Sequence, residues 1–105
     1  MTEQSGMSRK EKIGQMADFF KVFGDATRLR ILFILQEGEM AVQAVADALG
    51  MHQTAISQQL KLLRSSRLVK FRKEGRSIYY SLNDDHIVKI LSMGLEHINE
   101  THVSP

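Results

Sequence analysis

The amino-acid sequence predicts a single, mostly α-helical domain that contains one β-hairpin. Its 105 residues are close to the usual size of one domain. The only proline is Pro105, so no helix has to end early at a proline. Apolar residues recur with a helical period everywhere except in residues 68–82, which are rich in β-branched and aromatic residues. We expect residues 1–105 to form one domain, with disorder confined to residues 1–9 and 101–105.

The N-terminal part of the chain predicts two helices. In residues 10–23 the apolar side chains follow a period of 3.6 residues, and Gly24 would end this helix. Asp25 can cap a second helix, which would end near Gly38. The apolar face of the second helix is wide, which indicates a central, buried position. Its members are Leu29, Ile31, Leu32, Ile34 and Leu35.

Two further helices, at residues 41–49 and 53–65, are separated by a three-residue break that contains Gly50. The second has a narrow apolar face made by Ile56, Leu60 and Leu63. Its other face carries amide, hydroxyl and basic side chains, which are Gln53, Thr54, Ser57, Gln58, Lys61 and Arg64. This arrangement is typical of a helix-turn-helix, in which such side chains reach base edges and phosphates of DNA. It would equally suit a solvated helix face in an all-α bundle.

The segment that follows the fourth helix predicts a β-hairpin. Residues 68–71 and 78–82 would form its strands, with Glu74 and Gly75 as a tight turn. Four basic residues cluster toward the tip, where they could bind phosphates or enter a minor groove: Lys70, Arg72, Lys73 and Arg76. A helix-turn-helix followed by such a hairpin is a winged helix-turn-helix.

The distribution of charge indicates a surface that faces a polyanion such as nucleic acid, and a merely solvated charged face is the alternative. Residues 53–82 contain seven Lys or Arg and one Glu, a net charge of +6. Residues 1–52 contain six Lys or Arg and seven Asp or Glu, and residues 83–105 contain one and four, so these parts carry −1 and −3. The positive charge is therefore concentrated where the helix-turn-helix and the wing are expected.

A last helix, from residue 84 to about residue 99, carries Asp84, His86, His97 and Glu100, which are residue types that bind divalent metals. His97 and Glu100 share a helix face, but His86 lies about 16 Å from His97 along the axis, at 1.5 Å per residue. One helix cannot bring all four to one ion. Two helices packed antiparallel about a twofold axis near Ser92 could form two sites, each with Asp84 and His86 from one chain and His97 and Glu100 from the other. Asp84 and Asp85 could instead simply favour the positive end of the helix dipole, with His97 and Glu100 as surface residues near a C-terminus.

Three stretches resemble the ArsR/SmtB family of bacterial winged-helix repressors: FKVFGDATRLRILFIL, TAISQQLKLLRSSRLV and KEGRSIYYSL. The resemblance extends from about Met16 to Glu100. Around the recognition helix the family has Ser or Thr where Thr54 stands, Ser where Ser57 stands, and His or Gln where Gln59 stands. The chain departs from the family at Gln58, where His, Tyr or Arg is common, and we interpret this as a changed sequence preference because an amide still donates and accepts at a base edge.

The resemblance also implies a metal site. The family's C-terminal-helix sensor site has the pattern Asp-x-His, ten residues, then His-x-x-Glu or His-x-x-His, which Asp84, His86, His97 and Glu100 fit. The family's other site uses cysteines, but this chain has none, which disfavours soft ions. Two imidazoles and two carboxylates suit tetrahedral Zn(II), whereas Co(II) or Ni(II) would prefer extra ligands, for which His102 is the obvious spare.

The resemblance therefore implies a homodimeric transcriptional repressor, paired through its terminal helices, that leaves operator DNA when Zn(II) binds. One alternative is a winged-helix regulator that responds to Co(II), Ni(II) or a non-metal signal. The other, a small hydrolase, is disfavoured because the chain lacks an HExxH motif and a glycine-rich phosphate loop. We expect no enzyme activity and no small organic substrate. With no signal-peptide pattern and no apolar run near about 18 residues, we expect a cytoplasmic protein without a membrane partner.

Overall fold

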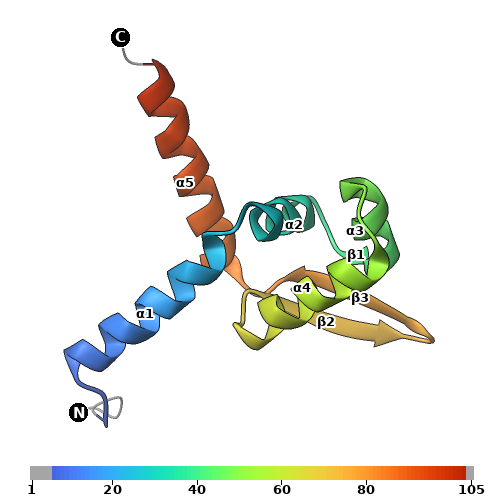
Figure 1. Cartoon of the computed structure of the whole chain (residues 1–105), viewed down its shortest axis with the longest axis horizontal. Helices are drawn as coiled ribbons and strands as arrows, with labels where there is room; N and C mark the ends of the chain where they lie inside the picture. The colour runs from blue at the N-terminus through green and yellow to red at the C-terminus, as the bar shows by residue number, and fades with distance from the viewer. Residues whose placement is uncertain (1–5, 104–105) are drawn as a thin grey trace.

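The computed structural model describes residues 6–103, with side chains to residue 100, and it confirms the predicted winged helix-turn-helix. Helices α2, α3 and α4 pack beside a small sheet whose hairpin projects to one side, while α1 and α5 project to the other (Figure 1). The elements in chain order are α1 Arg9–Phe23, α2 Ala26–Gln36, β1 Met40–Ala41, α3 Val42–Leu49, α4 Gln53–Ser65, β2 Val69–Glu74, β3 Ser77–Leu82 and α5 Asp85–Val103.

The helix ends follow from local capping. Ser8 Oγ accepts a hydrogen bond from Glu11 N at 3.1 Å, and the Glu11 side chain accepts one from Ser8 N at 2.8 Å, a capping box that starts α1 at Arg9. Asp25 caps α2 as predicted, by accepting from Arg28 N at 3.0 Å. Parts of the ends expected to be disordered, residues 1–5 and 104–105, lie outside the described residues. Of the other residues expected to be disordered, Ser8 caps α1 and Arg9 begins it. Residues 101–103 form the last turn of α5, so this helix ends at Val103 and not near residue 99 as predicted.

The sheet differs from the prediction in two ways. The hairpin turn lies at Gly75 and Arg76, with Gly75 at a φ of 62°, so Glu74 is the last residue of β2. A third strand, β1, pairs antiparallel with β3 and gives the strand order β1-β3-β2. We expected Ala41 to begin a helix, but it pairs with Tyr79 instead. A two-residue strand has no periodicity of its own, and it forms because β3 offers a free edge.

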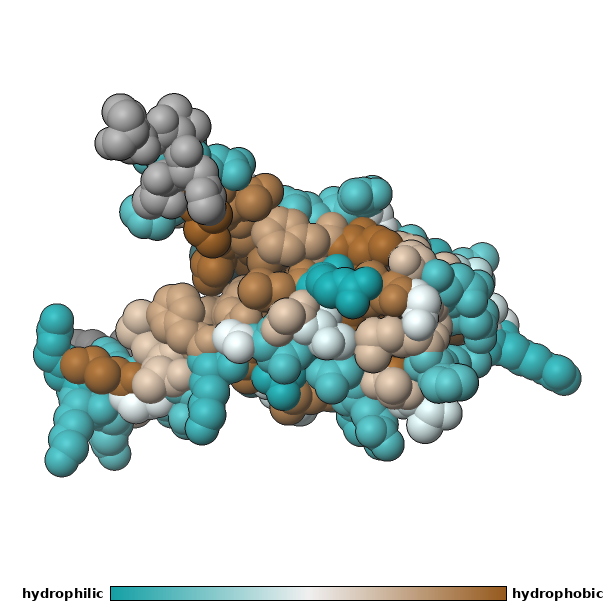
Figure 2. Space-filling model, turned by 45° about the horizontal axis from the view of Figure 1, so that its top comes forward, coloured by the Kyte–Doolittle hydropathy of each residue, from teal (hydrophilic) through white to brown (hydrophobic). Residues whose placement is uncertain are grey.

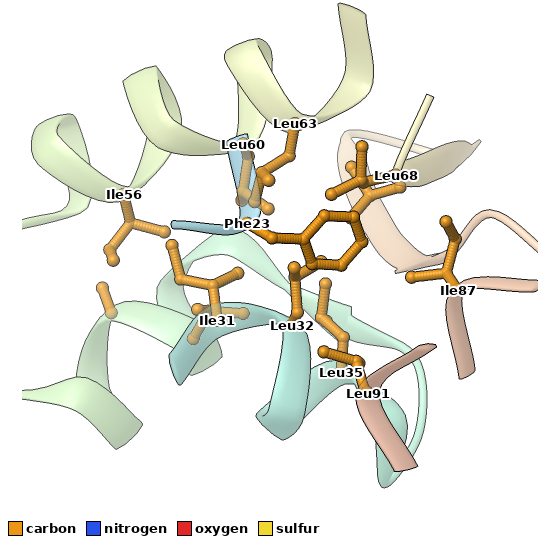
Figure 3. Packing of buried hydrophobic residues seen from close by; sticks show 13 residues of the cluster. Phe23, Ile31, Leu32, Leu35, Ile56, Leu60, Leu63, Leu68, Ile87 and Leu91 are labelled. Atoms are coloured by element: carbon orange, nitrogen blue, oxygen red, sulfur yellow. The ribbon is translucent and has the colours of Figure 1, made fainter. Parts of the chain in front are cut away.

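The core lies between α2, α4 and the sheet (Figure 3). The apolar face predicted for α4 is confirmed, because Ile56, Leu60 and Leu63 have no exposed surface. In Figure 3 these side chains point toward Ile31 and Leu32 of α2. This packing fixes the rotation of α4 about its axis, and with it the direction in which the polar face of α4 points.

The two terminal helices keep apolar faces that the chain does not bury. In α1, Met16 is 55% exposed and Phe20 is 49% exposed; in α5, Leu95 is 49% exposed and Ile98 is 53% exposed. Figure 2 shows hydrophobic surface along both projecting arms and in the recess between them. None of the helices in the described part of the chain is both long and apolar enough to cross a membrane.

Candidate nucleic-acid interface and metal-ligand residues

The polar face of α4 is open to solvent along its whole length. The side chains that we predicted to contact DNA from this helix are all exposed: Gln53, Thr54, Ser57, Gln58, Lys61 and Arg64. The turn before α4 depends on Gly50, whose φ of 66° ends α3 in the left-handed region that favours glycine. The helix therefore presents amides and hydroxyls at its N-terminal half and basic groups toward its C-terminus.

Gln59 is the exception among the α4 residues of the family pattern. It is half-buried, and its Oε1 accepts a hydrogen bond from Arg28 Nε at 3.2 Å. Arg28 Nη1 also donates to the carbonyl oxygen of Val22 at 3.4 Å. Arg28 thus joins the C-terminal end of α1 to α4. Sequence analysis missed this link because Arg28 and Gln59 are 31 residues apart.

The basic C-terminal end of α4 contacts the wing. The Arg64 guanidinium carbon lies 4.0 Å from the centre of the Phe71 ring, and the Phe71 ring packs against that of Tyr80 at 5.8 Å. A cation–π contact of this kind attracts the guanidinium to the face of the ring. Farther along the wing, Lys73 and Arg76 are exposed and form no ion pair with any side chain that the structure describes.

Arg72, which we predicted to bind phosphate, forms hydrogen bonds with two carboxylates of its own chain. Its Nε lies 2.7 Å from Glu39 Oε2, its Nη2 donates to Glu39 Oε1 at 2.8 Å, and its Nη1 donates to Glu74 Oε1 at 2.6 Å. The hydrogen bond with Glu39 is the main reason that the pKa of Arg72 is raised, and the same bond lowers the pKa of Glu39. Sequence analysis did not identify Glu39, because 33 residues separate it from Arg72.

Asp84 and His86 lie together at the start of α5. Asp84 Oδ1 accepts hydrogen bonds from the backbone N–H groups of His86 at 2.9 Å and Ile87 at 3.3 Å, so Asp84 caps the helix. The His86 Nδ1 atom lies 3.4 Å from the same oxygen. The pKa of Asp84 is lowered, chiefly by the hydrogen bond from the Asn83 amide. Both side chains are open to solvent, with His86 87% exposed.

His97 and Glu100 are exposed near the other end of α5. Within residues 6–100 of a single chain, no three His, Asp or Glu side chains come together as a metal site. The structure therefore brings Asp84 and His86 together at the start of α5, while His97 and Glu100 lie three positions apart near its other end. Each pair offers one imidazole and one carboxylate, and both are accessible, so the donor set fits a borderline divalent ion such as Zn²⁺ if two pairs from different chains meet.

Comparison with known proteins identifies the relatives of this chain. Residues 25–70 match the family model described as bacterial regulatory protein, arsR family. The chain is 41% identical to a transcriptional repressor SmtB homolog of Synechocystis sp. over 83% of its own length and 66% of that protein, slightly under two thirds. It is 35% identical to a cadmium resistance transcriptional regulatory protein CadC homolog of Staphylococcus aureus, over 87% and 76% of the two chains.

A solved structure supports the same assignment. The homodimeric winged helix-turn-helix DNA-binding domain of a possible ArsR-family transcriptional regulator from Mycobacterium bovis superposes with a TM-score of 0.80 at 32% identity. The match covers 93% of this chain and 92% of that one. The order of helices and the wing of the present chain therefore have a close counterpart among experimentally determined DNA-binding domains.

Proposed function

The chain belongs to the arsR family of bacterial regulatory proteins, and from this premise we propose that it is a homodimeric transcriptional repressor. A divalent metal ion, for which Zn(II) is the first candidate, would release it from operator DNA. The single observation that carries the proposal is the pairing of two features in one small chain. An exposed polar helix with a basic wing offers a DNA surface, and the two ends of α5 offer complementary metal-ligand pairs.

The DNA contacts follow from the geometry of α4 and the wing. We assign base reading to the exposed N-terminal part of α4, around Thr54, Ser57 and Gln58, because amides and hydroxyls form directed hydrogen bonds with base edges. We assign phosphate contacts to the basic residues farther along, Lys61, Arg64, Lys73 and Arg76, whose charge attracts any sequence equally.

The exposed apolar faces of α1 and α5 support a homodimer. Phe20 and Met16 on α1, with Leu95 and Ile98 on α5, would lose their contact with water against a second copy of this chain. Gly94 directly precedes Leu95 on α5, and a Cβ atom added to it would meet no atom of the same chain within 4 Å, so a neighbouring helix could approach closely there. The related M. bovis domain is homodimeric, which favours the same assembly here.

The proposed metal site is built between the two chains. Asp84 and His86 of one α5 would face His97 and Glu100 of the other. The midpoint of positions 84 and 100 and the midpoint of positions 86 and 97 both fall near Ser92, where the twofold axis would pass. A bound Zn²⁺ would supply coordinate bonds that cross-link the two α5 helices. The two recognition helices must sit about 34 Å apart to enter successive major grooves. If the bound metal fixed the α5 pair so that the recognition helices had another spacing, the affinity for DNA would fall. Bound DNA would then lower the affinity for the metal by the same factor.

A regulator that responds to another signal is the alternative, and one observation favours it. Asp84 has a structural role, since its carboxylate accepts hydrogen bonds from His86 N and Ile87 N and caps α5. A helix cap and two surface residues would then account for the ligand pattern. Co(II) or Ni(II) as the sensed ion is a variant of the main proposal, and for it the additional ligand candidate, His102, lies outside the residues whose side chains the structure describes.

The proposal is tested by titrating zinc into a preformed complex. The metal-free protein is first used to select a duplex from a random library, and the fluorescence anisotropy of that labelled duplex is then followed. We expect Zn²⁺ to dissociate the wild-type complex, and we expect His97→Ala to bind DNA normally but to resist dissociation. Glu96→Ala, which alters the neighbouring exposed carboxylate, serves as the control and should behave like wild type. Release of His97→Ala at the wild-type zinc concentration would contradict the proposed site.

A further inference from the structure

The contact between Glu39 and Arg72 spans the whole width of the sheet. Glu39 directly precedes β1, and Arg72 lies on β2, at the opposite edge. In the register of the sheet, Ala41, Tyr79 and Arg72 form one row across the three strands. The Arg72 guanidinium carbon lies 4.8 Å from the centre of the Tyr79 ring, so the side chain passes over the central strand to reach Glu39.

The chemistry of this contact leaves Arg72 poorly suited to bind phosphate. Three of its N–H groups are directed at carboxylate oxygens within 2.8 Å, and two of them form a bidentate pair with Glu39. One positive charge is thus matched by two negative charges. A DNA phosphate that approached Arg72 would have to displace the bidentate carboxylate, and it would be repelled by both Glu39 and Glu74.

The contact between Glu39 and Arg72 lies where it can orient the tip of the wing. The hairpin projects from the domain (Figure 1), and two-stranded hairpins are only marginally stable alone. Strand β1 adds only Met40 and Ala41 to the sheet. The bond from Arg72 to Glu39 ties β2, near the tip residues Lys73 and Arg76, to the segment that leads into the helix-turn-helix.

We propose that Glu39 is a positioning residue for DNA binding, which orients the wing through Arg72, and that Arg72 itself makes no phosphate contact. This inference rests on the proposed DNA-binding function and gives Arg72 a role different from the one expected from sequence. The inference predicts that loss of the Glu39 charge changes DNA affinity in the direction opposite to the one that electrostatics alone predicts. Removing the negative charge of Glu39 makes the protein more positive, which by electrostatics alone would strengthen DNA binding, whereas loss of wing orientation weakens it.

The test measures the affinity of full-length variants for the selected duplex at several salt concentrations. We expect Glu39→Gln and Arg72→Gln each to weaken binding about 3- to 10-fold, and we expect the double variant to be no weaker than either one. Arg72→Gln should leave the slope of log K against log salt unchanged. Arg76→Gln should lower the slope by about 0.9 per contact, hence about 1.8 per dimer, because it removes a counterion-releasing cation from each chain.

Glu37→Gln is the matched control, because Glu37 is an exposed carboxylate in the same connection and has no side-chain bond within the described chain. It should bind DNA as tightly as wild type or slightly more tightly. The thermal unfolding and dimerisation of every variant should match wild type, since the altered groups are exposed. Tighter binding by Glu39→Gln, or a slope that falls in Arg72→Gln as it does in Arg76→Gln, would overturn the inference. Failure of wild type to bind any duplex would instead contradict the proposed function on which it rests.

Discussion

Replacing Phe20 by alanine should separate the dimer while leaving each chain folded. Phe20 is 49% exposed in the single chain. A phenylalanine side chain buries roughly 200 Å² when fully covered, so about 100 Å² per ring remains for the partner. At about 25 cal/mol per Å², covering that area contributes about 2.5 kcal/mol per ring. The twofold symmetry doubles this to about 5 kcal/mol, which corresponds to more than three orders of magnitude in the dimer dissociation constant.

Sedimentation equilibrium over a range of protein concentrations measures this change directly. Gln15→Ala, on another face of α1, is the control and should leave the dissociation constant within about threefold of wild type. Thermal unfolding of dilute protein checks that the variant chain remains folded. A folded Phe20→Ala protein that dimerises as tightly as wild type would refute the assignment of the α1 face to the dimer interface.

Three further predictions concern the core, the recognition helix and the metal. Leu60→Ala, at a fully buried position, should lower the free energy of unfolding in urea by about 2–5 kcal/mol, and a loss no larger than that of half-exposed Leu62→Ala would contradict the packing described. Gln58→Ala should change the preferred base at one position of the selected duplex without altering the salt slope; the opposite pattern would make Gln58 a phosphate contact. Co²⁺ titration should give two ions per dimer with intense tetrahedral absorption bands, whereas weak octahedral bands would favour a site of the nickel or cobalt type.

The sequence was sufficient to predict helix α4, because a helix that is buried on one side has apolar residues at a regular helical spacing. Ile56, Leu60 and Leu63 recur on one face, and the structure buries all three. Once that face is fixed, the opposite face must point to solvent, so the exposure of Ser57 and Gln58 followed directly.

The contacts that position the DNA surface were not predictable in the same way. Strand β1 is two residues long and is specified by its partner β3 rather than by its own sequence. The bonds of Arg72 to Glu39 and of Arg28 to Gln59 join residues more than 30 positions apart. No local pattern marks such pairs, because they arise only when the chain is folded.

The metal-ligand residues could be predicted from the sequence only in part. Their spacing on α5 predicts that a single helix cannot join them, and within residues 6–100 of one chain no three His, Asp or Glu side chains come together. The alternative interpretation placed Asp84 at the positive end of the helix dipole, and in the structure its carboxylate caps α5. The meeting of the pairs across a twofold axis remains a proposal, since it depends on a second chain.

Zinc binding by mixed dimers is the measurement that tests this central claim most directly. One chain carries Asp84→Ala and His86→Ala, its partner carries His97→Ala and Glu100→Ala, and differently tagged subunits allow the mixed dimer to be purified. If the sites lie between chains, His97 and Glu100 of the first chain face Asp84 and His86 of the second, so one complete site survives and the other loses all its ligands. We therefore predict one tightly bound Zn²⁺ per mixed dimer and none in either homodimer. A folded mixed dimer that binds no zinc tightly would contradict the account.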